Sequence, residues 1–197
     1  MTNDMKIMYD ILAKKYGYDV KSLHLPTKER QELSFKAIME SVDLNNKTIL
    51  DVGCGFGDLV LFLNRQSIFV NYTGIDISDE IVKIGKKENP EVTDKLYVMN
   101  INDVVDKYDY VIISGMFNLK IDDNWSFIKS TLKKAFELCK EGVVFNLIST
   151  YVDYKEKHLF YVDPCDIFKY CKTLTKWVNI KYDYNDYEYT ISMFKED

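Results

Sequence analysis

The sequence is poor in cysteine and in long apolar stretches, and both shortages exclude classes of protein. Its four cysteines, Cys54, Cys139, Cys165 and Cys171, show neither metal-ligand spacing nor a paired framework, so we expect reduced thiols and no bound metal. No apolar run approaches the roughly 18 residues of a membrane span. No basic stretch followed by an apolar one marks a signal peptide. The sequence therefore predicts a cytoplasmic protein that makes no contact with membranes.

The sequence also lacks an excess of basic residues. It has 26 Lys and Arg against 31 Asp and Glu, which gives a net charge of −5. Proteins that bind nucleic acid usually present a basic field to the phosphates, so a nucleic-acid partner is not expected. The 197 residues are 47% hydrophobic and 29% charged, which is typical of one globular domain over residues 1–197. The oligomeric state does not follow from these values.

The most informative stretch is an apolar run, a glycine-rich turn and a second apolar run. Residues 48–52 predict a buried strand, and Leu59 begins an apolar helix. Between them stand Gly53, Gly55 and Gly57. Glycine allows positive φ angles and close approach of the backbone to a ligand, and the start of a helix offers free N–H groups. The stretch therefore predicts a site for a nucleotide-like ligand.

Two carboxylates distinguish this turn from the dinucleotide fingerprint G-x-G-x-x-G. Asp58 stands where that fingerprint has its third glycine, and Asp51 lies inside the strand. A carboxylate at that point would repel a pyrophosphate but suits a ligand with an ammonium group. Asp76 ends the next predicted strand, residues 70–76, 25 positions after Asp51 (76 − 51), where it can accept both ribose hydroxyls. An NAD-dependent dehydrogenase is therefore disfavoured.

Apolar periodicity and turn residues outline the other elements. The pattern predicts helices over residues 27–42, 78–89, 124–140 and 164–173, and strands over residues 95–99, 108–114 and 143–148. Thr27, Ser78 and Asp163 are the expected N-caps, and Gly142 is expected to follow a helix end. Residues 178–184 and 187–193 alternate and predict a hairpin with a turn at Asn185 and Asp186.

The stretch I-L-D-V-G-C-G-F-G, residues 49–57, closely resembles the first motif of the class I S-adenosylmethionine (SAM) dependent methyltransferases. The resemblance extends over about residues 48–149. It implies an α/β fold with a Rossmann-like, seven-stranded mixed sheet in the order 3-2-1-4-5-7-6, strand 7 antiparallel, and helices on both faces. It also implies SAM as the cofactor and an N-terminal segment, residues 1–26, that folds over the cofactor.

The resemblance further implies a set of cofactor contacts. In the family, a polar residue after the third strand binds the adenine amino group and the next residue packs on the ring. Asn100 and Ile101 match these places best, and Asn102 and Asp103 compete with them. Cys54 is expected to be a small packing group rather than a nucleophile. The expected contacts are Asp51, Gly53, Cys54, Gly55, Gly57, Asp76, Ile77, Asn100, Ile101 and Ser114.

The sequence does not identify the methyl acceptor, although the segment after the fourth predicted strand argues against one class of acceptor. Residues 114–118 lack the D/N-P-P-Y/F sequence that marks methylation of amide or exocyclic nitrogens in the family. The acidic composition and an aromatic segment, residues 149–163, favour a small molecule such as a sugar, a glycan precursor or a secondary metabolite. A protein side chain is the alternative acceptor. A SAM-binding module without catalysis is the alternative from another class.

Candidate acceptor contacts lie in three places along the chain. Arg30 and Gln31, at the start of a predicted helix, are expected to contact the cofactor tail or the substrate. The segment 149–163 is too long and too aromatic for a plain connection, so we expect a lid over the acceptor. His158 is its only histidine and the candidate base, with an ordinary exposed histidine as the alternative. The remaining expected substrate contacts are Phe117, Asn118, Tyr151 and Tyr161.

Overall fold

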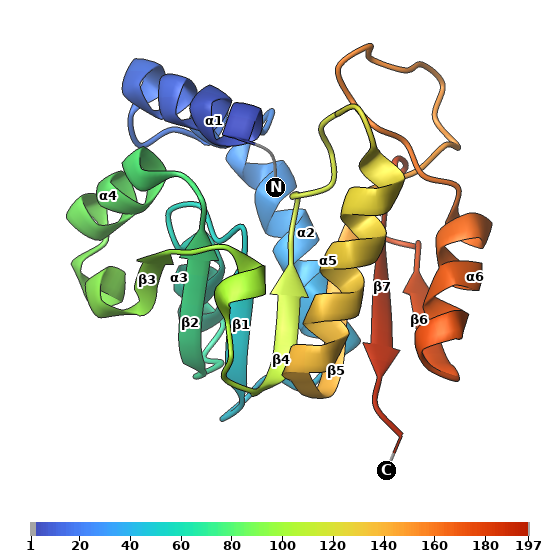
Figure 1. Cartoon of the computed structure of the whole chain (residues 1–197). Coiled ribbons are helices and arrows are strands. Elements are labelled where there is room, and N and C mark those ends of the chain that lie inside the picture. The colour runs from blue at the N-terminus through green and yellow to red at the C-terminus, as the bar shows by residue number, and fades with distance from the viewer. Residues whose placement is uncertain (1–2, 197) are drawn as a thin grey trace.

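The computed structural model describes residues 3–196 and is built on one seven-stranded sheet (Figure 1). Its order, β3-β2-β1-β4-β5-β7-β6, is the predicted one. β7 runs antiparallel to both β5 and β6, whereas the other pairs are parallel. The strands are β1 (Thr48–Val52), β2 (Asn71–Asp76), β3 (Leu96–Val98), β4 (Tyr108–Ile113), β5 (Cys139–Ile148), β6 (Trp177–Lys181) and β7 (Glu188–Phe194).

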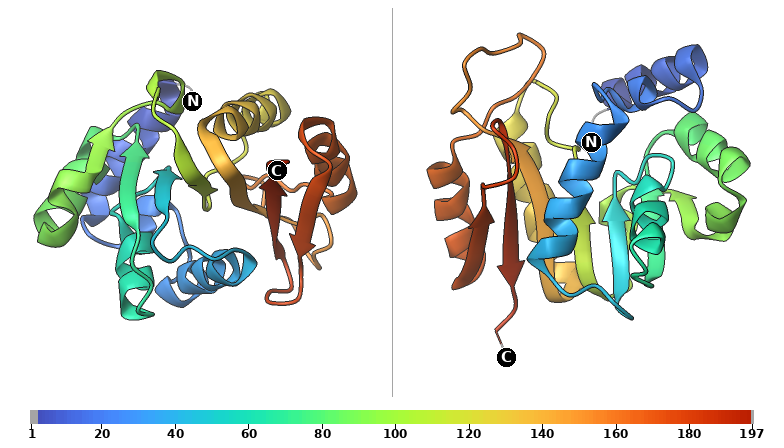
Figure 2. Two further views of the ribbon diagram at one scale, coloured as in Figure 1. Left: turned by 90° about the horizontal axis from the view of Figure 1, so that it is seen from below. Right: turned by 180° about the vertical axis from the view of Figure 1, so that it is seen from behind.

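Helices cover both faces of this sheet (Figures 1 and 2). Successive side chains of a strand point to opposite faces. In β4, Val111 and Ile113 therefore pack in one core with residues of α5 and α6, and Ile112 packs in the other with residues of α2 and α3. The helices are α1 (Asn3–Tyr16), α2 (Lys28–Ser41), α3 (Asp58–Arg65), α4 (Asp79–Glu88), α5 (Asn124–Leu138) and α6 (Pro164–Leu174), with short 3-10 turns η1 (Val20–Leu23), η2 (Pro90–Lys95) and η3 (Ile101–Asp103). None of the helices in residues 3–196 is both long and apolar enough to cross a membrane.

The predicted N-caps are confirmed. The hydroxyl of Thr27 accepts the N–H of Arg30 at 3.3 Å, and that of Ser78 accepts the N–H of Ile81 at 3.2 Å. The carboxylate of Asp163 accepts the N–H of Cys165 at 2.8 Å, with proline at the first position of α6. Each cap satisfies an N–H group that the helix leaves free, so these local signals fix where the three helices begin.

Two boundaries differ from the sequence-based prediction. β5 begins at Cys139, and Gly142 lies inside it rather than after a helix. A Cβ on Gly142 would stand 2.6 Å from the carbonyl oxygen of Met193 in β7, so this glycine permits close pairing of two strands. The predicted two-residue hairpin turn is also wrong: β6 ends at Lys181 and β7 begins at Glu188. The longer loop between them places its last residues at the sheet edge.

Two segments cover the carboxyl ends of the parallel strands (Figure 1). One contains α1 and η1, which pack on each other, while α1 also packs on α4. The carboxylate of Asp10 accepts the hydroxyl of Ser78 at 2.5 Å, and Lys6 pairs with Asp79. The other segment, residues 149–163, follows β5. Its two ends pair with each other through Ser149 and Val162, and the N–H of Val162 donates to the carbonyl of Ile148, the last residue of β5, at 2.8 Å. These segments therefore cover part of the space at the carboxyl edge of the sheet.

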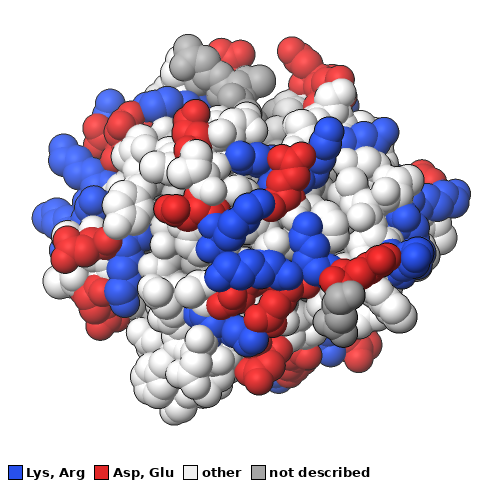
Figure 3. All heavy atoms as spheres, turned by 60° about the horizontal axis from the view of Figure 1, so that its bottom comes forward, with Lys and Arg blue, Asp and Glu red and all other residues white. Residues whose placement is uncertain are grey.

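The opposite edge of the sheet carries paired surface charges. On the face that Figure 3 shows, basic and acidic side chains are interleaved. At the starts of β1 and β5, Lys47 pairs with Glu141 at 2.6 Å and Lys140 with Asp109 at 3.2 Å. Exposed pairs of this kind contribute little to stability. The hollow part of the molecule is the edge under α1 and residues 149–163.

Candidate active site

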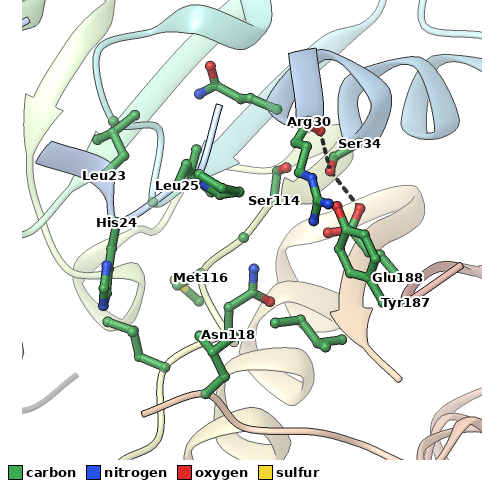
Figure 4. Close-up of a pocket in the computed structure, with 18 of the residues that line it drawn as sticks. Leu23, His24, Leu25, Arg30, Ser34, Ser114, Met116, Asn118, Tyr187 and Glu188 are labelled. Carbon is green, nitrogen blue, oxygen red and sulfur yellow. Dashed lines mark hydrogen bonds between the residues drawn. The ribbon is translucent and has the colours of Figure 1, made fainter. Parts of the chain in front are cut away.

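A cavity of about 960 Å³ lies at the carboxyl edge of the sheet, the usual ligand position in open α/β folds. Its lining comes from the ends of β1, β2 and β4 and from the segment that contains η1 and the start of α2. Residues 151–161 and the first residues of β7 close the other side. Figure 4 shows side chains from η1, the start of α2, the turn after β4 and the start of β7 around one space.

The glycine turn forms part of the cavity floor. Gly53 and Gly55 line it, with φ angles of +74° and +57°. A Cβ on Gly55 would stand 3.0 Å from the side chain of Leu23 in η1. Gly57 has φ of +83°, but it does not line the cavity, and its Cβ would contact Leu96 and Val92 at 3.2 Å. The first two glycines therefore shape the ligand side, and the third lets α3 begin close to β3.

Two carboxyl groups stand beside this turn, one buried and one partly buried. Asp51 is 3% exposed, and its Oδ2 accepts the hydroxyl of Tyr72 at 2.6 Å. Burial raises the pKa of Asp51 to about 7, and the hydrogen bond from Tyr72 opposes the rise. Burial also raises the pKa of Asp76 to about 6, against N–H groups that favour its charged form, among them that of Gly55 at 3.2 Å. A cation or hydroxyl donor in the cavity would restore the charged form of both groups.

Other predicted cofactor contacts fall inside and outside the cavity. Cys54, Ile77 and Ser114 line it. Asn100 and Ile101 do not: the Asn100 side chain accepts the N–H of Asn102 at 3.0 Å at the start of η3, and Ile101 is buried in the core that α5 and α6 share. The competing residues Asn102 and Asp103 are also absent from the lining. Beyond Asp76 the lining includes Ile77, Ile81 and Tyr9.

The start of α2 brings two predicted side chains to the cavity. Gln31 donates to Asp58 Oδ2 at 3.3 Å, and Lys28 pairs with Asp58 Oδ1 at 2.6 Å. Asp58, which the sequence places in the glycine motif, is thus a buried link between α2 and α3. Arg30 also lines the cavity, where its guanidinium stacks 4.4 Å from the centre of the Tyr187 ring. Gln31 and Arg30 therefore face different ends of the cavity.

The turn after β4 divides between cavity and core. Asn118 lines the cavity, and its Oδ1 is buried with no hydrogen-bond partner among the described residues. Phe117 does not line the cavity, because its ring packs into the core at 5.7 Å from Phe127 and 6.2 Å from Phe145. Ser114 Oγ accepts the side-chain amide of Asn146 at 3.3 Å.

The segment 149–163 contributes the aromatic wall. Tyr151, Tyr154, Tyr161 and His158 line the cavity. The imidazole of His158 is about half exposed, lies 3.4 Å from Glu156, and stacks on the imidazole of His24 with 5.1 Å between centres. The segment is fixed to the turn after β4, because the N–H of Phe160 donates to the carbonyl of Asn118 at 2.9 Å. His158 therefore stands at the mouth of the cavity.

Sequence reasoning missed Glu188, the first residue of β7. Its carboxyl group lines the cavity, is 6% exposed and accepts hydrogen bonds from Ser34, Tyr184 and Asn146. Burial raises its pKa to about 7. The sequence did contain a signal for a functional carboxyl group, because Glu188 is the one charged residue in the strand Glu188–Phe194. Only the antiparallel direction of β7 brings it to the carboxyl edge.

The chemistry of the lining fits SAM. Six of the residues that line the cavity carry carboxyl groups. Arg30 is the one lysine or arginine in the lining. Such a set suits a ligand with net positive charge and several hydroxyls rather than a phosphate ester. The two lining glycines allow the ligand to approach the backbone. No group of three or more metal-ligating side chains is placed together within residues 3–196.

Comparisons with known proteins agree with this geometry. A family model described as a methyltransferase domain matches residues 50–145. A protein of Mycobacterium tuberculosis, provisionally named a methyltransferase, is 33% identical over 157 residues, which cover 75% of this chain and 93% of the relative. Magnesium protoporphyrin IX methyltransferase from Synechocystis PCC 6803, solved with S-adenosylhomocysteine (SAH), has a TM-score of 0.66 at 12% identity over 98% of this chain and 95% of its own. A plantazolicin methyltransferase bound to SAH and a substrate analogue has a TM-score of 0.63 at 13% identity over 99% and 92%.

At these identities the solved structures show a shared fold, which is the Rossmann-like methyltransferase class. The match to the mycobacterial protein covers nearly its whole length and shows the family as well. The chain belongs to the class I SAM-dependent methyltransferases. The cofactor predicted from the glycine motif is therefore the cofactor of its family.

Proposed function

We propose that this methyltransferase acts on a small molecule that enters the cavity under residues 149–163. When bound, SAM supplies a methyl carbon already activated by its sulfonium, so the protein mainly orients the reactants and excludes water. The observation that carries the proposal is the pair of carboxyl groups, buried Asp51 and partly buried Asp76, beside the glycine turn of a large cavity. Residues 3–26 and 149–163 then cover the two ends of that cavity within one domain.

At the cofactor end, each group has a task that its position supports. Asp76 accepts the ribose hydroxyls, and the charge of Asp51 attracts the ammonium group of the cofactor. Gly53 and Gly55 let the backbone approach the cofactor, while Cys54 and Ile77 form its walls. Gln31, held by Asp58 near the glycine turn, is the residue of α2 best placed for the amino-acid tail.

At the acceptor end, the size and concave shape of the cavity favour a small molecule. Asn118, Tyr151 and Tyr161 line this end, and tyrosines provide amphipathic walls. Two solved relatives carry small-molecule substrates in their names, magnesium protoporphyrin IX and plantazolicin. A protein side chain is the alternative acceptor, and a non-catalytic module would bind SAM without forming SAH. SAH release with small molecules, peptides or neither separates these three functions.

Calorimetric titration tests the cofactor end without an acceptor. Asp76→Ala removes a buried acceptor of two hydroxyls, at a cost of about 1–3 kcal/mol, so SAM affinity should fall roughly tenfold or more. Asp123→Ala, which removes an exposed carboxylate at the start of α5, is the matched control and should leave SAM affinity unchanged. Tighter binding of NAD than of SAM by the unaltered protein would refute the assignment.

A further inference from the structure

Glu188 occupies a position that the fold makes functional. It is the first residue of β7 and pairs with Ile148, the last residue of β5. Because β7 is antiparallel, its beginning lies at the edge where the parallel strands end. A carboxyl group that belongs to a buried strand thereby enters the cavity (Figure 4).

The two oxygens of this carboxyl group have different surroundings. Oε1 accepts the hydroxyl of Ser34 at 2.5 Å, that of Tyr184 at 3.1 Å and the amide of Asn146 at 3.3 Å. Within residues 3–196, no hydrogen bond reaches Oε2. Three donors on one oxygen fix the orientation of the group. The other oxygen is left for a donor that enters the cavity.

Asn146 ties this carboxyl group to the turn after β4. Its side-chain nitrogen donates at 3.3 Å both to Glu188 Oε1 and to Ser114 Oγ, and its Oδ1 accepts the N–H of Gly115 at 2.8 Å. Glu188 therefore lies beside the strand end that the family fold turns toward the transferred methyl. His158 lies on the outer side of the same cavity and is about half exposed.

Arg30 completes the polar end of the cavity. Its guanidinium stacks on Tyr187, and in the described part of the chain it forms no ion pair with Glu188 and donates no side-chain hydrogen bond. Figure 4 shows Arg30 and Glu188 reaching the same region from α2 and β7. The positive charge of Arg30 favours the ionised carboxylate, against burial, which raises its pKa to about 7. This balance suits a group that takes up and releases a proton near neutral pH.

We propose that Glu188 is the catalytic base for O-methylation of a small hydroxy acid, with Arg30 binding the acid group of the acceptor. The proposal rests on the proposed function. Oε2 accepts the acceptor's hydroxyl proton while the hydroxyl oxygen forms its bond to the methyl carbon. The carbon–sulfur bond breaks, its electron pair stays on sulfur, and the cofactor leaves as SAH. The proton passes from Glu188 to solvent after the products leave.

The first test needs no acceptor. Protein labelled with ¹³C at the glutamate carboxyls is titrated from about pH 4 to 9, and the signal lost in Glu188→Gln identifies Glu188. We expect that signal to titrate near neutrality, in the presence and absence of SAH. A Glu188 signal that does not titrate between about pH 5 and 8 would overturn the proposal, whatever the acceptor.

The second test uses 4-hydroxyphenylacetate, with 4-aminophenylacetate and 4-hydroxybenzyl alcohol as matched probes, and measures SAH release. We expect the hydroxy acid to be methylated in preference to both analogues. Glu188→Gln should lower kcat by about 10²-fold or more and remove the acid limb of the pH profile, with SAH affinity unchanged within about threefold. Glu188→Asp should restore part of the rate. Glu141→Gln at the opposite sheet edge is the control and should keep full activity.

The outcomes separate this proposal from the proposed function. Failure of the unaltered protein to bind SAM would refute the proposed function itself. Normal SAM binding with a preference for the amine probe, or loss of turnover in His158→Asn but not in Glu188→Gln, would overturn the role of Glu188.

If Glu188→Gln does not fold, Tyr184→Phe replaces it. Loss of that hydrogen bond should raise the Glu188 midpoint, and an unchanged midpoint would contradict the geometry. If no probe is methylated, the carboxyl titration decides.

Discussion

At the scale of single residues, the acids of the glycine region divide into two kinds. Asp58 is buried and paired with Lys28 at 2.6 Å. Asp51 and Asp76 are oriented only by neutral donors, namely Tyr72 and backbone N–H groups. A buried carboxylate without a cationic partner is costly, and protonation relieves that cost in the absence of ligand. Asp58 therefore serves the fold, whereas Asp51 and Asp76 suit a ligand with positive charge.

Gly55→Ala tests whether the glycine turn serves the ligand. The substitution forces a Cβ to 3.0 Å from Leu23 at a φ of +57°, a strain of about 1–3 kcal/mol. Leu23, which lines the cavity, must then shift. We expect roughly tenfold weaker SAH binding by calorimetry, with a near-native far-UV spectrum.

Gly17→Ala is the matched control for this substitution. Gly17 has a φ of +64°, but no atom lies within 4 Å of its added Cβ, and it does not line the cavity. It should therefore lose some stability and keep its affinity for SAH. Equal affinities in the two variants would show that Gly55 serves the turn alone.

At the scale of elements, two segments far apart in the sequence meet above the sheet edge. The two histidines of the chain, His24 after η1 and His158 in the segment 149–163, stack against each other there. The N–H of Lys120 donates to the carbonyl of His158 at 2.9 Å, so the second segment is anchored beside the turn after β4. The segment 149–163 is thus held beside the sheet edge, while its Tyr151 and Tyr154 are exposed.

Tyr9→Ala tests whether α1 contributes to cofactor binding. Tyr9 lines the cavity, and burial together with the nearby charge of Asp76 raises the pKa of its hydroxyl. Loss of an aromatic wall costs about 1 kcal/mol, so SAH affinity should fall about fivefold. Tyr16→Ala, at the exposed end of the same helix, should bind SAH normally. An unaffected Tyr9→Ala protein would mean that α1 only packs on α4.

The elements that could be predicted are those with local signals. The strand Thr48–Val52, the three N-caps and the order of the strands follow from glycines, capping residues and the resemblance. The start of β5 and the length of the β6–β7 loop could not be predicted from local signals. Gly142, for example, is set by the close approach of Met193 in another strand. It is harder still to predict from the sequence which residues line the cavity. Ser34 and Glu188 are separated by 154 positions, and no periodicity reports that contact.

At the scale of the whole molecule, the buried carboxyls make stability depend on pH. Burial raises the pKa of Asp51 from 3.8 to about 7, that of Asp76 from 3.8 to about 6 and that of Glu188 from 4.5 to about 7. The folded state therefore binds protons that the unfolded chain has already released. Their contribution to stability is fully present below about pH 4 and is lost as pH rises toward about 7.

We therefore expect the unliganded protein to lose stability as pH rises from about 4 to about 7. One pKa unit corresponds to about 1.4 kcal/mol for each group, and three groups titrate in this window, so urea unfolding should show a fall of several kcal/mol. Asp51→Asn keeps an acceptor for Tyr72 and removes the titrating group, so its stability should change less with pH. In Asp123→Asn, which lacks a carboxylate whose pKa is lowered by the N–H of Ser126, the fall should persist.

SAM should bind more tightly as pH rises through the same window, because its positive charge favours ionised Asp51 and Asp76. Stability that instead rises toward pH 7.5 would show that these carboxyls are already ionised in the unliganded protein.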